Sequence, residues 1–526
     1  MTAIKEMPVG WAYAKLGDLV QVLRGITYDK SVARDSGGPG LIPILRATNI
    51  GQHLDFEDLV FVPESCVSEE QRLRPGDIVV AASSGSRSVV GKAAPLSIAW
   101  TGSFGAFCVA VRPSELVNPR YIAFFLTTSE YRERVSTLAA GVNINNLKRE
   151  HILSTPINLA PRNEQDRIVA ELEKQFTQLE AGVEAVKRVQ AQIKRYRSAV
   201  LKAACEGRLV PTEADLARRE KRDYEPADKL LARILKERRA RWEGDQLAKM
   251  KAVGKPPKDD RWKAKYVEPL MPLTGGLPSL PEGWMWASLD QLTSVVTSGS
   301  RGWADHYSDS GPLFIRAQDI KTDTLQLEAV ARVNPPANAE GTRTRVTSGD
   351  LLITITGANV TKSALVPNSI PEGYVSQHVG LARPIETGIG AFLFTWIVSP
   401  AHGRHYLEKC AYGAGKPGLN LEQLRELTVA LPPLKEQQRI VMEVESRMSL
   451  ANSCDASVKT NLSRAARLRQ AILHKAFAGG LVPQIPADEP ASKLLEHISA
   501  EEGAKPVSKQ GRYKTTTAVP KMKATR

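Results

Sequence analysis

The chain carries one sequence pattern twice, 272 residues apart. Residues 161–169 read P-R-N-E-Q-D-R-I-V and residues 433–441 read P-L-K-E-Q-Q-R-I-V, so six of nine positions are identical. The same offset relates residues 201–211 to residues 473–483. A period of this length is far beyond the roughly 20 to 50 residues of solenoid repeats. The repeated unit is therefore a whole domain with a helix attached, and the chain resembles a dimer made from one polypeptide.

Each copy begins with short strands that are separated by Gly and Pro. Residues 77–82 and 106–111 are the clearest strands of the first copy, and residues 119–134 are expected to form a helix. In the second copy, a strand is expected over residues 350–355 and a helix over residues 390–402. Both stretches predict α+β or mostly β domains of ordinary size.

From Asn163 onward the spacing of apolar residues changes to a heptad, and the second copy keeps the same phase. This is the pattern of a coiled coil. Asn163 is the expected N-cap, and Gly207 and Gly479 are stop signals. A helix over residues 164–206 would be roughly 60 Å long. The seam consists of Leu172, Phe176, Leu179, Val183, Val186 and Ile193 in the first copy and of Val444, Met448, Val458 and Leu462 in the second, with Gln190, Arg197, Asp455 and Arg469 as polar exceptions.

Two such helices in one chain most economically pack against each other, because an isolated long helix with a continuous apolar seam lacks a partner. An antiparallel arrangement would relate the two copies by a pseudo-twofold axis. In the alternative arrangement, each helix packs only on its own domain.

A charged stretch over residues 215–266 follows the first helix and contains A-D-K-L-L-A-R-I, which A-S-K-L-L-E-H-I echoes at residues 491–498. It predicts a short amphipathic helix and then a basic linker, either exposed to solvent or docking a partner. The expected organisation comprises domain 1 (1–160), a coiled-coil helix (161–211), a charged helical appendage and linker (212–275), domain 2 (276–432), a second coiled-coil helix (433–484) and a short helix with a basic tail (485–526).

The charge distribution points to an acidic partner. The chain has 71 Lys and Arg against 57 Asp and Glu. Residues 187–275 hold 24 of these bases and 13 of the acids, and residues 503–526 hold seven bases and no acid. A basic balance of this kind suggests nucleic acid or an acidic protein as partner. The alternative for the tail is a disordered, solubilising segment.

The sequence shows no sign of an active site. The five cysteines form no C-x-x-C pair, the histidines form no H-x-x-x-H pair, and no G-x-S-x-G motif occurs. We therefore expect neither catalytic residues nor a metal site. The N-terminal residues lack an apolar signal core, and the cysteine usage suits a reducing compartment, so a cytoplasmic protein is expected.

Polar loops recur at the ends of equivalent strands in both copies. Short hydroxyl, amide and cationic side chains on glycine-bearing loops are suited to hydrogen bonds with base edges and phosphates. The candidates for DNA contact are Arg46, Ser84, Ser86, Arg87, Lys92, Asn143, Asn145 and Lys148 in the first copy, and Arg316, Thr354, Thr356, Asn359, Thr361, Lys362, Lys416 and Asn420 in the second.

These motifs resemble a known family. The segment P-x-x-E-Q-x-x-I-V opens both predicted helices, and the strand signals G-D-I-V at residues 76–79 and G-D-L-L at residues 349–352 recur with them. In this respect the whole chain resembles the specificity subunit of Type I restriction-modification systems.

The resemblance implies a non-catalytic subunit with two target-recognition domains that read the halves of a bipartite, asymmetric site in double-stranded DNA. It implies that the helices, with Glu164, Gln165, Glu436 and Gln437 at their starts, and the adjoining surfaces bind two methylation subunits, and that restriction subunits join the assembly. S-adenosylmethionine, ATP and Mg²⁺ would be bound by those partners and no cofactor by this chain. A self-contained DNA-modifying enzyme and a coiled-coil scaffold are the alternatives.

Overall fold

The computed structural model describes residues 7–140, 145–299, 301–334, 343–413 and 417–504, and structural statements below refer to these residues. The chain divides into two compact units. Unit 1 comprises residues 1–186 and 460–526, and unit 2 comprises residues 187–459. The candidate residues Asn143 and Lys416 lie outside the described residues.

The globular part of unit 1 is built on a four-stranded antiparallel sheet with a three-stranded sheet beside it. The first has the order β2 (Val20–Arg24), β9 (Cys108–Pro113), β5 (Ile78–Ala81) and β7 (Ala93–Pro95). The second has the order β4 (Val60–Pro63), β3 (Leu41–Leu45) and β8 (Ser103–Phe104), with β3 and β8 parallel. A further pair joins β1 (Ala12–Lys15) to β11 (Pro156–Leu159).

The globular part of unit 2 repeats this topology. Its four-stranded sheet has the order β13 (Thr293–Ser298), β21 (Val379–Pro384), β18 (Leu351–Thr354) and β19 (Ser363–Leu365). Its three-stranded sheet has the order β17 (Ala331–Val333), β14 (Tyr307–Ile315) and β20 (Gly373–Val375), again with one parallel pair, and β12 (Met285–Ser288) joins β22 (Thr428–Leu431). The predicted duplication and the α+β class are confirmed.

The repeated Gly-Asp signal has the same structural role in both domains. Asp77 lies at the start of β5, is buried, and accepts two hydrogen bonds of 2.7 Å from Arg112 on β9. Asp350 and Arg383 form the corresponding pair at 2.7 and 2.8 Å. Each pair ties the start of a central strand to its neighbour, so the motif stabilises the sheet.

The helices of the two domains differ from expectation in detail. The helix predicted over residues 119–134 is two helices, α1 (Pro119–Phe125) and α2 (Ser129–Leu138), because Thr128 caps a new start with its side chain. Unit 2 has α7 (Leu289–Leu292), α9 (Gly390–Val398), α10 (Gly403–Cys410) and α11 (Leu421–Arg425), and unit 1 also has α3 (Arg149–Leu153).

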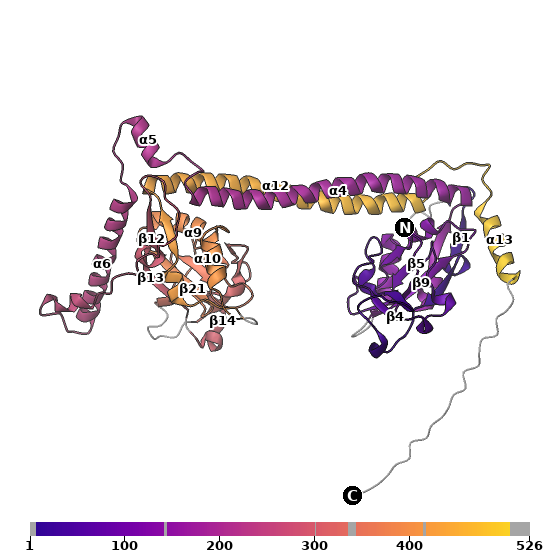
Figure 1. Ribbon diagram of the computed structural model, residues 1–526, viewed down its shortest axis with the longest axis horizontal. Helices are drawn as coiled ribbons and strands as arrows, with labels where there is room; N and C mark the ends of the chain where they lie inside the picture. The colour runs from indigo at the N-terminus through magenta and orange to yellow at the C-terminus, as the bar shows by residue number, and fades with distance from the viewer. Residues whose placement is uncertain (1–6, 141–144, 300, 335–342, 414–416, 505–526) are drawn as a thin grey trace, which may run out of the picture. The chain divides into compact units, whose positions relative to one another are not determined.

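Two long helices carry the heptad seams, α4 (Arg162–Cys205) and α12 (Leu434–Phe477) (Figure 1). Asn163 lies inside the first turn of α4, so its prediction as N-cap is wrong. Both helices instead begin directly after a proline, and the backbone N–H of Gln165 donates to the carbonyl of Pro161 as that of Gln437 does to Pro433. Gly207 and Gly479 have positive φ angles of 68° and 73° just beyond the helix ends, as the stop signals predict.

Within each unit the described parts of α4 and α12 pack together in antiparallel fashion. In unit 1 the first half of α4 lies along the last half of α12, and unit 2 holds the other two halves. The seam residues are buried or half-buried along both helices, whereas most positions between them are exposed. The coiled-coil prediction is confirmed, and so is the antiparallel direction.

Two arginines that interrupt the seam form bonds between the helices. In unit 2, Arg197 donates to the carbonyl of Ala451 and, at 2.8 Å, to the side chain of Asn452. In unit 1, Arg469 forms an ion pair of 3.2 Å with Glu180, and its guanidinium lies 3.9 Å from the ring centroid of Phe176. Both arginines and both partners are related by the 272-residue offset, so the polar exceptions follow the pseudo-twofold symmetry.

The charged stretch after α4 is more helical than predicted. It contains α5 (Glu213–Glu220), α6 (Ala227–Ala252) and a short 3-10 helix, η6 (Asp260–Lys265). The short amphipathic helix expected near residue 227 thus continues for 26 residues through the basic run that was expected to be linker. Its counterpart at the end of the chain is α13 (Ala491–Ala504).

In the described part of the chain, no helix is both long enough and apolar enough to cross a membrane.

Candidate nucleic-acid interface

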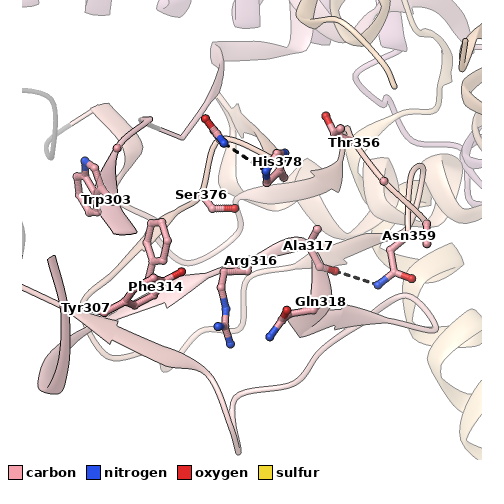
Figure 2. A pocket seen from close by; sticks show the side chains of 14 residues that line it. Trp303, Tyr307, Phe314, Arg316, Ala317, Gln318, Thr356, Asn359, Ser376 and His378 are labelled. Atoms are coloured by element: carbon pink, nitrogen blue, oxygen red, sulfur yellow. Dashed lines mark hydrogen bonds between the residues drawn. The ribbon is translucent and has the colours of Figure 1, made fainter. Parts of the chain in front are cut away.

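A cavity of domain 2 lies where several polar loops meet (Figure 2). It has a volume of about 440 Å³. Its walls come from the end of β14, the short helix η8 (Ala317–Asp319), the loop after β18 and the turn between β20 and β21. It therefore brings together residues that lie more than 70 positions apart in the sequence.

Aromatic rings form one wall of this cavity. Trp303 stacks on Phe314 with centroids 5.5 Å apart and planes 20° apart, and it contacts Tyr374 at 5.4 Å. Tyr307 meets Phe314 edge to face at 5.7 Å. These packed rings give the wall a fixed shape, since ring pairs of this geometry stabilise one arrangement.

Arg316 lies between Phe314 and Gln318 in the lining of the cavity (Figure 2) and is held by a neighbouring carboxylate. Its Nε and Nη2 donate to Asp319 at 3.2 and 3.3 Å, and its backbone N–H donates to the same group at 2.8 Å. The hydrogen bonds that the guanidinium donates to Asp319 raise the pKa of Arg316, so this group stays charged. An arginine held in this way presents its remaining donors in a defined direction, which suits recognition of base edges or phosphates.

The polar loop after β18 supplies two predicted residues to the same cavity, Thr356 and Asn359. The side-chain amide of Asn359 donates to the carbonyl of Ala317 at 3.1 Å, which fixes the loop next to Arg316 (Figure 2). Thr356 forms a β-bridge with Gly418, so the second predicted cluster, near residue 418, does lie beside this loop.

Other predicted residues of domain 2 are buried or form hydrogen bonds within the domain. Thr354 is fully buried, and Thr361 is 3% exposed, with its hydroxyl near Arg404. The side chain of Asn420 caps α11 by accepting from the N–H of Gln423 at 2.8 Å. Lys362 is half-buried. Thr354 and Thr361 therefore lie outside the candidate interface, because their polar atoms face the domain interior.

In domain 1 the corresponding arginine has a different partner. Asn49 stands where Asp319 stands, and its side chain still accepts from the N–H of Arg46 at 2.9 Å. The guanidinium of Arg46 instead pairs with Asp58 at 3.0 Å, from a separate loop. The two domains thus share a framework but hold their arginines with different residues.

The structure joins the two polar clusters that the sequence predicts for domain 1. The short strand β6 (Ser83–Ser84) pairs with β10 (Asn145–Asn146), and the amide of Asn145 donates to the carbonyls of Ser84 and Gly85 at 3.3 Å. Around this pairing, the exposed predicted residues are Ser86, Arg87, Lys92 and Lys148. They form a polar surface with three positive charges.

Sequence reasoning missed part of the domain 2 cavity. Trp303, Gln318, Ser376 and His378 also line it. The parallel pairing of β14 with β20 brings residue 376 next to residue 315, and no local motif indicates that contact. The stretch G-S-R-G-W before residue 304 was the one available signal, since Gly and Trp in a polar loop often mark a shaped surface.

The Glu and Gln residues in the first turn of each long helix form hydrogen bonds in the protein interior. Gln165 and Gln437 are fully buried and donate to the carbonyls of Ala160 and Pro432. Glu436 accepts from Trp284 Nε1 at 2.9 Å and from the N–H of Glu213 at 2.8 Å. Glu164 is buried at the corresponding place. Burial raises the pKa of both glutamates. These side chains join helix to domain and are not on the surface.

Among the described residues, no cluster of three His, Cys, Asp or Glu side chains could hold a metal ion. That the whole chain binds no metal stays a prediction.

A sequence model of the Type I restriction modification DNA specificity domain matches residues 8–193 and 339–446, more than half of the chain. The chain belongs to this family. The Type I restriction enzyme StySPI specificity subunit of Salmonella potsdam is 29% identical to this specificity subunit over 524 residues, 97% of this chain and 99% of that protein. The EcoKI specificity subunit of Escherichia coli (strain K12) is 28% identical over 529 residues, with the same coverage.

The fold agrees with that family. A chain solved in work on complex assembly and conformational transition of the type I R-M system superposes with a TM-score of 0.60 at 16% identity, and covers 90% of this specificity subunit and 100% of that chain. At this identity the likeness shows the fold alone. The long-helix pair and the duplicated domains are thus features of a known architecture, and recognition of DNA is the function of the family.

Proposed function

We propose that this specificity subunit reads a bipartite, asymmetric site in double-stranded DNA, with residues 1–160 and 276–432 each recognising one half. The observation that supports this proposal best is that equivalent loops of the two domains present different side chains although the domains share one fold. Arg316 is held by Asp319, whereas Arg46 is held by Asp58. Two domains with the same fold and different surface donors would prefer different base sequences.

The proposed interface in domain 2 is the cavity with Arg316, Gln318, Thr356 and Asn359 around it. Its counterpart in domain 1 is the surface with Arg46, Ser84, Ser86, Arg87, Lys92 and Lys148. Asn145 is buried and holds the loop of Ser84 from within the domain. Exposed arginines and lysines would contact phosphates and make binding strongly dependent on salt, while donors held in place would discriminate bases.

The subunit itself is proposed to be non-catalytic and to dock two methylation subunits, with restriction subunits in the larger assembly. S-adenosylmethionine, ATP and Mg²⁺ would belong to those partners. Apolar side chains outside the coiled-coil seam support a docking role for the unit 2 part of the helices: Met442 and Leu450 are each 62% exposed, and Val189 and Tyr196 are also exposed. Such side chains are candidates for a protein interface.

The test is to express this subunit with its methylation subunit and to map adenine methylation across a genome by single-molecule sequencing. A split, asymmetric motif is expected, and replacement of residues 1–160 by those of a relative should change one half of it. A palindromic motif would contradict the two-domain proposal. Methylation by the purified chain alone would favour a self-contained enzyme, and DNA binding without sequence preference would favour a scaffold.

A further inference from the structure

The duplication extends into the last residues of the chain. Residues 255–263 read K-P-P-K-D-D-R-W-K, and residues 505–514 read K-P-V-S-K-Q-G-R-Y-K. After this one-residue insertion the spacing is constant, so Pro269 and Met271 correspond to Pro520 and Met522. The tail that follows α13 is therefore a second copy of the segment that follows α6.

The first copy of this segment packs against α6 at its start, where Trp262 stacks on Trp242 with ring centroids 5.9 Å apart, and against domain 2 at its end. The backbone N–H of Leu270 donates to Asp290 at 2.9 Å, and the hydroxyl of Ser288 donates to the carbonyl of Leu270 at 2.5 Å. Arg238 of α6 donates to the hydroxyl of Tyr266 at 2.8 Å and to the carbonyl of Thr293 at 3.2 Å. The segment thus runs beside α7 and closes the space between α6 and the start of β13.

Domain 1 has the same surface features beside α13 that domain 2 has beside α6. The N–H of Ala491 at the start of α13 donates to the carbonyl of Gly10 at 2.8 Å, as that of Ala227 at the start of α6 donates to Gly283. The apolar residues Leu494 and Ile498 are buried in domain 1, as their counterparts on α6 are in domain 2. The helix η1 (Leu16–Asp18) occupies the place of α7.

A groove of about 840 Å³ lies between α13 and domain 1. Ile498 and Glu501 line it from the helix, and Val20, the counterpart of Thr293, lines it from the domain. Its charged residues are Arg74, Asp77, Arg112, Glu115 and Glu501. Asp77 and Arg112 neutralise each other, which leaves Glu115 and Glu501 against Arg74. The described chain ends at residue 504, one helical turn after Glu501, which lines this groove.

We propose that residues 505–522 dock onto α13 and domain 1, in this groove and beside η1, as residues 255–271 dock onto α6 and domain 2. The occupant is thus a segment of the same chain. Its five basic residues without an acid suit a groove with a surplus carboxylate. Eighteen residues reach at most roughly 60 Å when extended, which is ample for the return from residue 504 to η1. The proposal does not depend on how the domains read DNA.

The test compares hydrogen exchange in the full chain and in a chain that ends after Ala504. We expect backbone amides of residues 15–21 and 491–501 to exchange at least threefold faster in the shortened chain, because the docked tail protects them. A chain that ends after Met522 is the matched control and should exchange like the full chain. Equal exchange in all three chains would overturn the proposal.

Point variants distinguish the effect of lost docking contacts from the effect of a shorter chain. Tyr513→Ala with Met522→Ala should reproduce the effect of the truncation, whereas Thr515→Ala with Thr516→Ala should not. The measurement is repeated with a duplex DNA of unrelated sequence. Protection that appears only with DNA would show that the tail is a DNA-binding segment and would overturn the proposal, whereas protection in its absence supports docking on domain 1.

Discussion

The indole nitrogen of Trp284 donates a hydrogen bond of 2.9 Å to the carboxylate of Glu436, in the interior of unit 2. Trp284 opens domain 2, and Glu436 lies in the first turn of α12. The other oxygen of Glu436 accepts from the backbone of Glu213 at the start of α5. One buried carboxylate therefore joins the domain, the long helix and the appendage, which explains why the motif that opens each helix contains a glutamate.

Trp284→Phe should destabilise the protein. The change removes the donor and leaves a buried carboxylate oxygen without its partner, at a cost of about 1 to 3 kcal/mol. Urea unfolding of the full chain measures the difference. Trp286→Phe is the matched control, because that ring packs edge to face on Trp396 and lies outside the Glu436 bonds. Equal losses for the two variants would assign the effect to ring size and not to the hydrogen bond.

Glu213→Gln should change the dependence of stability on pH. Burial alone would raise the pKa of Glu213, but Arg222 and Arg439, each 2.6 Å away, outweigh it and hold the pKa below its usual value of 4.5. A lowered pKa gives stabilisation that is complete above the usual value and is lost as the pH falls through the folded-state value.

The melting temperatures of wild type and Glu213→Gln should therefore differ most near neutral pH and converge in acid, once the pH has fallen below the folded-state pKa of Glu213. Thermal unfolding over a pH series provides the measurement. The control is Glu220→Gln, which removes an exposed partner of the same Arg222. It should shift the melting temperature little at any pH. A constant difference between wild type and Glu213→Gln across the series would contradict the role assigned to this ion pair.

Arg469→Ala should weaken the helix pair in unit 1. The substitution removes the guanidinium over the Phe176 ring and the ion pair with Glu180, and we expect a loss of about 1 to 2 kcal/mol. Arg469→Met keeps most of the packing volume and should retain much of the stability. Circular dichroism during thermal unfolding distinguishes them. If Met were as damaging as Ala, the charge and not the packing would dominate.

Arg316→Ala should relax recognition in one half of the DNA site only. A donor that contacts a base edge contributes about 1 to 3 kcal/mol, so methylated motifs should become degenerate at one or two positions. Single-molecule sequencing of methylated genomic DNA, with the methylation subunit present, reports this. Arg345→Ala is a suitable control, since Arg345 is an exposed arginine of domain 2 outside the cavity. Degeneracy in both half-sites would be incompatible with the assignment of one half to each domain.

The sequence alone predicted the duplication, the class of the two domains and the long coiled-coil helices with their stop glycines. These features depend on local spacing, since a heptad seam or a glycine at a helix end can be recognised within a short stretch of sequence. The same local reading misplaced Asn163 as a cap and ended α6 too early, because helix ends depend on what surrounds them.

Only the tertiary structure decided which polar residues face a common surface. Thr354 and Thr356 are two positions apart, yet one is buried and the other lines a cavity, because Thr354 is the last residue of β18 inside the sheet whereas Thr356 lies in the loop that follows the strand. The neighbours of Arg316 in that cavity include Trp303 of the short helix η7 (Trp303–His306) and Ser376, which the parallel pairing of β14 with β20 places there although it is 60 positions away in sequence. Periodicity indicates which face of an element is apolar, whereas the partner of that face depends on the folding of the whole domain.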